Sequence, residues 1–135
     1  MKSKSIWTQK YQSVVDNGRN HSVVIDLPDA KGGSNNGATA LEMCVMSFSG
    51  CVGTIFAMVA SKMRIHFDKL EVNVEAEQQD NAPTITHVNY TLFIRTTEEH
   101  EKIEKCLEHT ENTCPVGVLY KQAGVVINRN IKYID

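Results

Sequence analysis

The fold is decided by a largely apolar stretch in the first half of the chain. Residues 39–60 read TALEMCVMSFSGCVGTIFAMVA. Thr39 and Glu42 form a capping box pattern, in which the hydroxyl accepts from the Glu42 N–H while the carboxylate reaches back to the Thr39 N–H. No proline follows as far as Ile65. The pattern therefore predicts one long helix over residues 39–66.

The middle of this helix is long enough to raise the question of a membrane span. Residues 43–60 make up 18 positions without a charged side chain, which is the length that a transmembrane helix needs. The run contains serine and glycine, however, and strand-like sequence lies on both sides of it. We therefore favour a soluble protein whose central helix is apolar all round because sheets enclose it on all sides.

The sequence before the helix is typical of β-structure. Ile6–Val15 is rich in β-branched and aromatic residues and ends at the turn signal Asp16-Asn17-Gly18. The segment 21–27 follows as a second short strand, so a hairpin that turns around Asn17-Gly18-Arg19 is predicted. The polar, glycine-rich segment 29–37 is predicted to be a loop, and it matches neither of the common phosphate-binding patterns.

The sequence after the helix alternates with a period of two and then becomes helical again. We predict a second hairpin from strands 69–78 and 84–95. A charged helix capped by Thr96 or Thr97 follows over 96–110. Cys114-Pro115 opens a short helical turn over 114–124, and the last strand is 125–134. This order predicts an α+β fold with antiparallel sheets packed around a long central helix.

Composition restricts the class of protein. The length of 135 residues fits a single domain, 1–135. A balance of 14 Lys+Arg against 16 Asp+Glu gives a formal charge of -2, which argues against a nucleic-acid partner. The N-terminus lacks the apolar run of a signal peptide, so we expect a cytoplasmic protein without a membrane partner, in which the four cysteines stay reduced.

Cysteine and histidine spacing does not indicate a metal centre. The cysteines at 44, 51, 106 and 114 are too far apart for a structural zinc motif. The five histidines show no HExxH pattern. We therefore expect no metal and no cofactor.

The four cysteines differ in their surroundings. Cys44 and Cys106 are interpreted as core residues. Cys51 follows Ser-Gly and precedes another glycine, small residues that leave room around its sulfur. Cys114 stands at a helix start, where unpaired N–H groups and the helix dipole favour the thiolate. From residue types alone, a Cys51–Cys114 pair is one possibility, and inert packing is the other.

Four segments together resemble the OsmC/Ohr family, the osmotically induced protein C and organic hydroperoxide resistance proteins. They are the stretch 38–51 with its Ser-Gly-Cys, residues 62–65, residues 70–74, and Cys114-Pro-Val-Gly. The resemblance spans nearly the whole chain. It implies an OsmC-like α+β fold, a tightly intertwined homodimer with active sites at the subunit interface, and thiol peroxidase activity on organic hydroperoxides.

The resemblance also implies roles for individual residues. Cys51 would be the peroxidatic nucleophile, Cys114 the resolving thiol, and Glu42 the carboxylate that holds a catalytic arginine. Arg19, the only arginine of the N-terminal hairpin, would be that arginine. The alternatives stay open, because Glu42 could serve only the capping box and Arg19 could be an exposed turn residue.

A cation is also demanded by the chemistry itself. A free cysteine of pKa about 8.5 is only a few per cent thiolate at pH 7. The middle of a helix offers little dipole stabilisation, and apolar burial favours the thiol. A nearby guanidinium, from Arg19 or from the partner subunit, is therefore expected next to Cys51.

The mechanism implied is a sulfenic acid on Cys51, a Cys51–Cys114 disulfide, and reset by a dithiol reductant such as a lipoyl group. Two other functions remain compatible with the sequence. One is a thiol-based redox sensor, and the other is a non-catalytic OsmC-like module that binds a small ligand. Apolar residues around Cys51 could line a pocket for an alkyl group, although core packing explains most of them; they are Met43, Phe48, Val52, Ile55 and Phe56.

Overall fold

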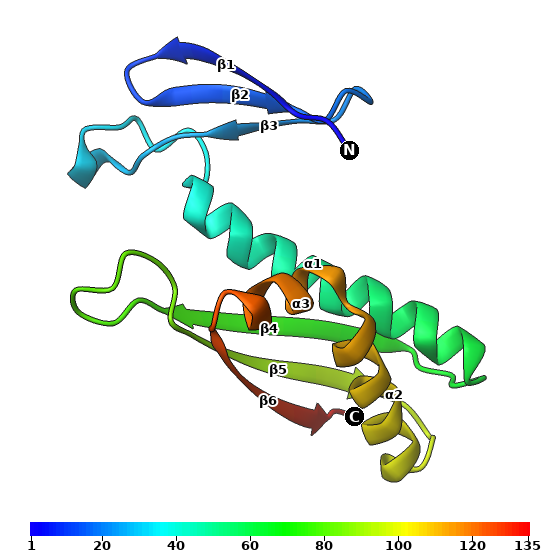
Figure 1. Ribbon diagram of the computed structural model, residues 1–135. Helices are drawn as coiled ribbons and strands as arrows, with labels where there is room; N and C mark the ends of the chain where they lie inside the picture. The colour runs from blue at the N-terminus through cyan, green and yellow to red at the C-terminus, as the bar shows by residue number, and fades with distance from the viewer. The chain divides into compact units, whose positions relative to one another are not determined.

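The computed structural model describes residues 1–135 and has the predicted α+β architecture. Its elements in chain order are β1 (Lys4–Gln9), β2 (Gln12–Asp16), β3 (Ser22–Ile25), the 3₁₀ turn η1 (Asp29–Lys31), α1 (Ala40–Lys62), β4 (Lys69–Glu77), β5 (His87–Arg95), α2 (His100–Thr113), α3 (Pro115–Gln122) and β6 (Val126–Tyr133). The chain divides into two compact units, Met1–Cys44 and Val45–Asp135, which are described separately (Figure 1).

The N-terminal unit is a three-stranded antiparallel sheet in the order β1-β2-β3. The predicted hairpin around Asn17-Gly18-Arg19 is confirmed as the β2–β3 connection. The prediction of a single strand over 6–15 is wrong, because the chain turns back between Gln9 and Gln12. Lys10 takes a positive φ of 42° there, and this turn lacks the glycine or asparagine that usually marks a tight hairpin.

The C-terminal unit contains a mixed sheet in the order β4-β5-β6. β4 and β5 pair in the antiparallel manner that the alternating pattern predicts, from Lys69↔Arg95 to Glu77↔His87. β6 pairs with β5 in parallel, so this sheet is not purely antiparallel as predicted. The reason is the crossover through α2 and α3, since a parallel pair needs a long connection between its strands.

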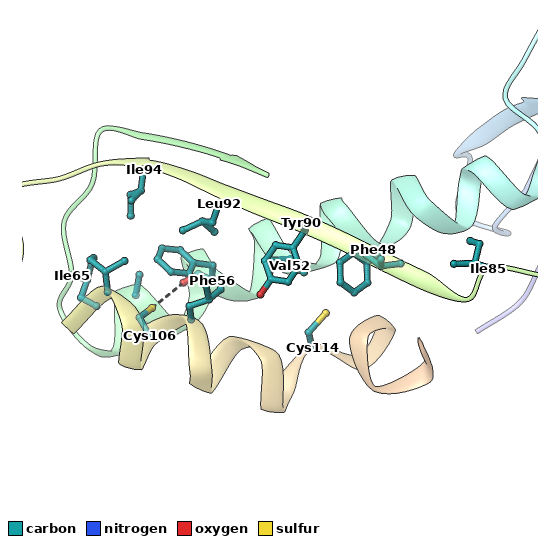
Figure 2. Packing of buried hydrophobic residues seen from close by; sticks show 14 residues of the cluster. Phe48, Val52, Phe56, Ile65, Ile85, Tyr90, Leu92, Ile94, Cys106 and Cys114 are labelled. Carbon is teal, nitrogen blue, oxygen red and sulfur yellow. Dashed lines mark hydrogen bonds between the residues drawn. The ribbon is translucent and has the colours of Figure 1, made fainter. Parts of the chain in front are cut away.

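The core of this unit lies between the sheet and the helices (Figure 2). One face of β5 is buried at every second residue, as its alternation predicts. α1 contributes a buried side chain at every fourth residue, and α2 covers the far end. The central members are Val88, Tyr90, Leu92 and Ile94 from β5, Phe48, Val52, Phe56 and Ala60 from α1, and Ile103, Cys106 and Leu107 from α2. Full burial of each large apolar side chain stabilises the fold by about 1.5–3 kcal/mol.

α1 ends earlier than the predicted residue 66. Arg64 adopts a left-handed φ of 54°, the Ile65 N–H donates to the Ala60 carbonyl at 2.9 Å, and the Arg64 N–H donates to the Ser61 carbonyl at 3.2 Å. These two bonds form a Schellman motif, which usually contains glycine at the left-handed position. The arginine there conceals the helix end in the sequence.

α2 also begins later than predicted, at His100 rather than after a Thr96 or Thr97 cap. The Thr96 hydroxyl is engaged elsewhere, because it donates to the His66 carbonyl and accepts from the Glu98 N–H. This hydroxyl therefore fixes the loop between β5 and α2 instead of capping the helix.

Contrary to the prediction from its apolar sequence, α1 is not buried on all sides. Only 22% of its most apolar 18-residue window is buried within the chain, and Met46 and Met58 are 55% and 52% exposed. By length and composition alone the helix could cross a membrane. That is weak evidence, since the core helix of a soluble protein has the same composition.

Candidate thiol site

Two elements position the thiols of the C-terminal unit. Cys51 lies in the middle of α1. Cys114 lies at the junction of α2 and α3, where it ends one helix and caps the next. Its N–H donates to the Thr110 carbonyl at 2.8 Å. Pro115 enforces the break, because it suits the first helical position and drives the residue before it into extended backbone.

The fold brings the two sulfurs into contact although 63 residues separate them in sequence. The Cys114 thiol donates to the Cys51 sulfur with an Sγ–Sγ distance of 2.8 Å, and both cysteines are unbridged. The Gly117 N–H in turn donates to the Cys114 sulfur at 3.4 Å. A disulfide requires about 2.05 Å, so a small movement of either side chain is enough for a bond to form.

The two sulfurs differ in their access to solvent. Cys51 is partly exposed, whereas Cys114 is 1% exposed and belongs to the buried core (Figure 2). An oxidant that arrives from solvent therefore meets Cys51 first. The core encloses Cys114, and its sulfur contacts that of Cys51.

Burial raises the pKa of the Cys114 thiol, and the hydrogen bond to Cys51 raises it further. The Gly117 N–H at the start of α3 lowers the pKa, in the direction that a helix N-terminus predicts, but it does not outweigh burial. Cys114 is consequently a neutral thiol at pH 7. The predicted influence of the helix start is present, but burial, whose depth the sequence does not show, outweighs it.

The other two cysteines lie outside this contact. Cys106 is fully buried against the Phe56 carbonyl, and burial raises its pKa to about 11; its interpretation as a core residue is confirmed. Cys44 is exposed, and its interpretation as a core residue is wrong. It precedes Phe48, the first buried residue of α1, by one helical turn.

Glu42 and Arg19 belong to the N-terminal unit. The Glu42 carboxylate accepts from the Thr39 N–H at 2.6 Å, and the Glu42 N–H donates to the Thr39 hydroxyl at 3.2 Å. These hydrogen bonds complete the predicted capping box and lower the pKa of Glu42. Arg19 is exposed in the β2–β3 turn, where its backbone N–H donates to the Asn17 side chain at 2.8 Å.

A polar chain beside Cys114 was not apparent from the sequence. The Tyr90 hydroxyl donates to a Glu111 oxygen at 2.7 Å. The other Glu111 oxygen lies 3.6 Å from Arg129 Nε, and Arg129 also lies 3.4 Å from Glu104. Alternation identifies Tyr90 only as a core residue and Glu111 only as part of a charged helix. No local signal shows that they meet.

No metal-binding arrangement of three or more His, Cys, Asp or Glu side chains is present in residues 1–135. The site itself offers one partly exposed and one buried cysteine whose sulfurs are in contact. Two thiols at this distance have the geometry from which thiol–disulfide exchange starts.

The family is shown by sequence. The model of the OsmC family, described as OsmC-like protein, matches residues 32–129. Because this range covers well over half of the chain, the chain belongs to the OsmC-like protein family. None of the curated protein sequences compared with the chain matches it.

Solved structures agree with this fold. The chain is similar to an OsmC-like protein from Mycoplasma pneumoniae, with a TM-score of 0.87 and 15% identity over 99% of this chain and 96% of that one. It is similar to an organic hydroperoxide resistance protein, OsmC, from Legionella pneumophila, with a TM-score of 0.72 and 12% identity over 97% of this chain and 95% of that one. It is also similar to the organic hydroperoxide resistance protein OhrB of Bacillus subtilis, with a TM-score of 0.65 and 17% identity; the match covers 98% of this chain and 98% of that one. At these identities the likeness concerns the fold.

The sulfur contact predicts which cysteines cross-link. Diamide, which oxidises neighbouring thiols, should produce an intramolecular Cys51–Cys114 disulfide, because these two sulfurs lie 2.8 Å apart. Peptide mapping by mass spectrometry without reduction measures the linkage. Cys44→Ser, which changes an exposed thiol, should leave the yield unchanged. A main product that links Cys44 or Cys106 to another cysteine would contradict the geometry.

Proposed function

We propose that this OsmC-like chain is a thiol-dependent peroxidase that reduces organic hydroperoxides. The observation that carries the proposal is the 2.8 Å contact between a partly exposed sulfur and a buried one. That arrangement suits a two-cysteine cycle, in which the accessible thiol meets the oxidant and the enclosed thiol removes the product. The family, and structural neighbours named as organic hydroperoxide resistance proteins, support the substrate class.

The first step takes place at Cys51. Its thiolate attacks the distal oxygen of the hydroperoxide, an S–O bond forms, and the O–O bond breaks. The alkoxide that leaves takes up a proton and becomes an alcohol, while the sulfur becomes a sulfenic acid. Two electrons pass from sulfur to the peroxide.

The second step uses Cys114. Its sulfur attacks the sulfenic sulfur, so that an S–S bond forms and the S–O bond breaks with release of water. A dithiol reductant, for which we propose a lipoyl-type group, then attacks the disulfide by thiolate exchange and becomes a disulfide itself. We place this cycle in the reducing cytoplasm, where such dithiols are maintained.

We further propose that an arginine from the N-terminal hairpin keeps Cys51 ionised, with Glu42 holding that arginine. The N-terminal hairpin offers Arg19 as its one candidate. A guanidinium close to a thiolate favours the charged form by about 1–3 pKa units. The Glu42 carboxylate is negatively charged at neutral pH, since its hydrogen bonds to Thr39 lower its pKa.

Peroxidase turnover is the primary test. Catalytic decay of cumene hydroperoxide should occur with dihydrolipoamide as reductant and should disappear in Cys51→Ser. Cys114→Ser should lose steady turnover but still reduce one equivalent, because the first step does not need the buried thiol. Cys44→Ser is the matched control and should retain the wild-type rate.

Two other outcomes would contradict this function. A single stoichiometric oxidation in the wild-type protein, with no turnover in excess reductant, would indicate a redox sensor. Unmodified thiols after hydroperoxide treatment would indicate a non-catalytic module.

Arg19→Ala should slow the reaction of Cys51 with iodoacetamide at pH 7 by about tenfold, the loss expected if one pKa unit of thiolate stabilisation disappears. Arg19→Lys keeps a cation at the same position and should react at an intermediate rate. The rates are measured by mass spectrometry of the Cys51 peptide. Equal rates in all three proteins would show that another cation serves Cys51.

A second copy of the chain is the partner that we propose for the exposed side of α1. Met46 and Met58 place two large apolar side chains there, each more than half exposed, and the family resemblance implies an intertwined homodimer. Light scattering after gel filtration should give twice the chain mass of 15.1 kDa. Met46→Glu with Met58→Glu should shift it toward the monomer, since a charge in an apolar interface is costly. A wild-type monomer at micromolar concentration would contradict this proposal.

A further inference from the structure

A small cavity of ≈ 10 Å³ lies directly beside the buried sulfur of Cys114. It holds about as much room as one water molecule needs. Its lining combines apolar side chains with four groups that can exchange protons or carry charge. The lining residues are Phe48, Val52, Tyr90, Glu111, Cys114, Gly117, Lys121 and Ile127.

The resolving step requires the buried Cys114 thiol to lose its proton. Cys114 is neutral and 1% exposed, yet its thiol proton must leave when its electron pair forms the S–S bond. In the balanced step the S–O bond of the Cys51 sulfenic acid breaks, the departing hydroxide takes a proton and one water is released. Because the thiol must lose its proton before the hydroxide has formed, that proton needs a transient acceptor within the protein.

Glu111 is the one carboxylate among the residues that line the cavity. Its side chain is 23% exposed, so it can exchange protons with solvent where Cys114 cannot. Tyr90 connects the two, because its hydroxyl donates to Glu111 at 2.7 Å. Figure 2 shows the Tyr90 hydroxyl and the Cys114 sulfur pointing into the space between the sheet and the helices.

The charged groups around Glu111 come from every neighbouring element. Arg129 of β6 lies 3.6 Å away and Tyr90 of β5 donates to it. Lys121 of α3 donates to the Glu111 backbone carbonyl at 3.5 Å. Glu104, also on α2, shares Arg129. Cys51 of α1 and Cys114 are the thiols beyond the cavity.

We propose that Glu111 is a positioning residue of the resolving step, which accepts the Cys114 thiol proton through the Tyr90 hydroxyl and a single water in the cavity. This inference rests on the proposed function in assigning Cys114 the role of resolving thiol. In the reduced protein the Cys114 thiol donates to the Cys51 sulfur; once Cys51 is oxidised, its hydrogen turns to the cavity and passes through the water and Tyr90 to Glu111. Glu111 then releases this proton to solvent, and solvent supplies the proton with which the hydroxide from the sulfenic acid leaves as water.

Tyr90 serves as a relay and does not become charged. Burial, and then the hydrogen bond to Glu111, raises the pKa of its hydroxyl strongly. The phenol therefore stays protonated. It accepts a proton from the cavity water only as it donates its own proton to Glu111. Arg129 holds the Glu111 carboxylate in place for this exchange.

The test is a rapid-quench comparison of wild type with Glu111→Gln. Dimedone trapping follows sulfenic acid at Cys51, and non-reducing mass spectrometry follows the disulfide. Glu111→Gln should slow disulfide formation at pH 7 by at least about tenfold, a modest share of what proton transfer contributes. Sulfenic acid formation should stay within about twofold of wild type, because neither Cys114 nor Glu111 takes part in that step.

The pH profile separates proton transfer from simple damage to the structure. In Glu111→Gln, disulfide formation should accelerate about tenfold per pH unit, since hydroxide becomes the remaining acceptor. Tyr90→Phe removes the relay while keeping the ring and should show the same slope. Glu104→Gln is the matched control; it also contacts Arg129 but does not line the cavity, and it should keep the wild-type rate and profile.

A second trigger distinguishes this inference from the proposed function. Diamide forms an adduct on Cys51 that Cys114 displaces, so the resolving attack can be measured without a peroxide. Slow, pH-dependent resolution of Glu111→Gln with diamide supports the proton path even if no sulfenic acid forms with cumene hydroperoxide, a result that would overturn the peroxidase function alone. Wild-type resolution rates and pH profiles in both Glu111→Gln and Tyr90→Phe would overturn the inference.

Discussion

The break in the chain at Cys114-Pro115 is the constraint on which the site depends. Proline cannot continue α2, so the helix ends and a new one starts with Cys114 at its cap. The buried residues of α1 position Cys51, because Phe48 and Val52, which flank it in sequence, pack into the core. Together these two features set the sulfurs 2.8 Å apart.

Unequal burial gives the two thiols different chemistry. Cys51 is open to solvent on one side, whereas the core encloses Cys114 and keeps it neutral. A buried neutral thiol resists irreversible oxidation, since the reactive species is an accessible thiolate. As a consequence, the proton of the Cys114 thiol must be transferred before its sulfur can react. The polar chain through Tyr90 and Glu111 is the route that we propose for this proton.

Much of the fold follows from local patterns, and the site follows only in part. Alternation identifies the buried face of β5, and the capping box places the start of α1. The early end of α1 at an arginine and the turn at Lys10 lack the usual glycine, so they were missed. The contacts of Tyr90 with Glu111 join segments 21 residues apart. Such contacts arise from packing, which a single sequence does not encode in any short motif.

The central claim is that one hydroperoxide molecule consumes these two thiols and no others. An anaerobic titration of the reduced protein with cumene hydroperoxide, with free thiols counted by a chromogenic reagent after unfolding, tests it most directly. Two thiols should disappear per hydroperoxide, titration should stop at one equivalent per chain, and Cys44 and Cys106 should remain reduced. Loss of one thiol per hydroperoxide, or continued loss beyond two thiols per chain, would contradict it.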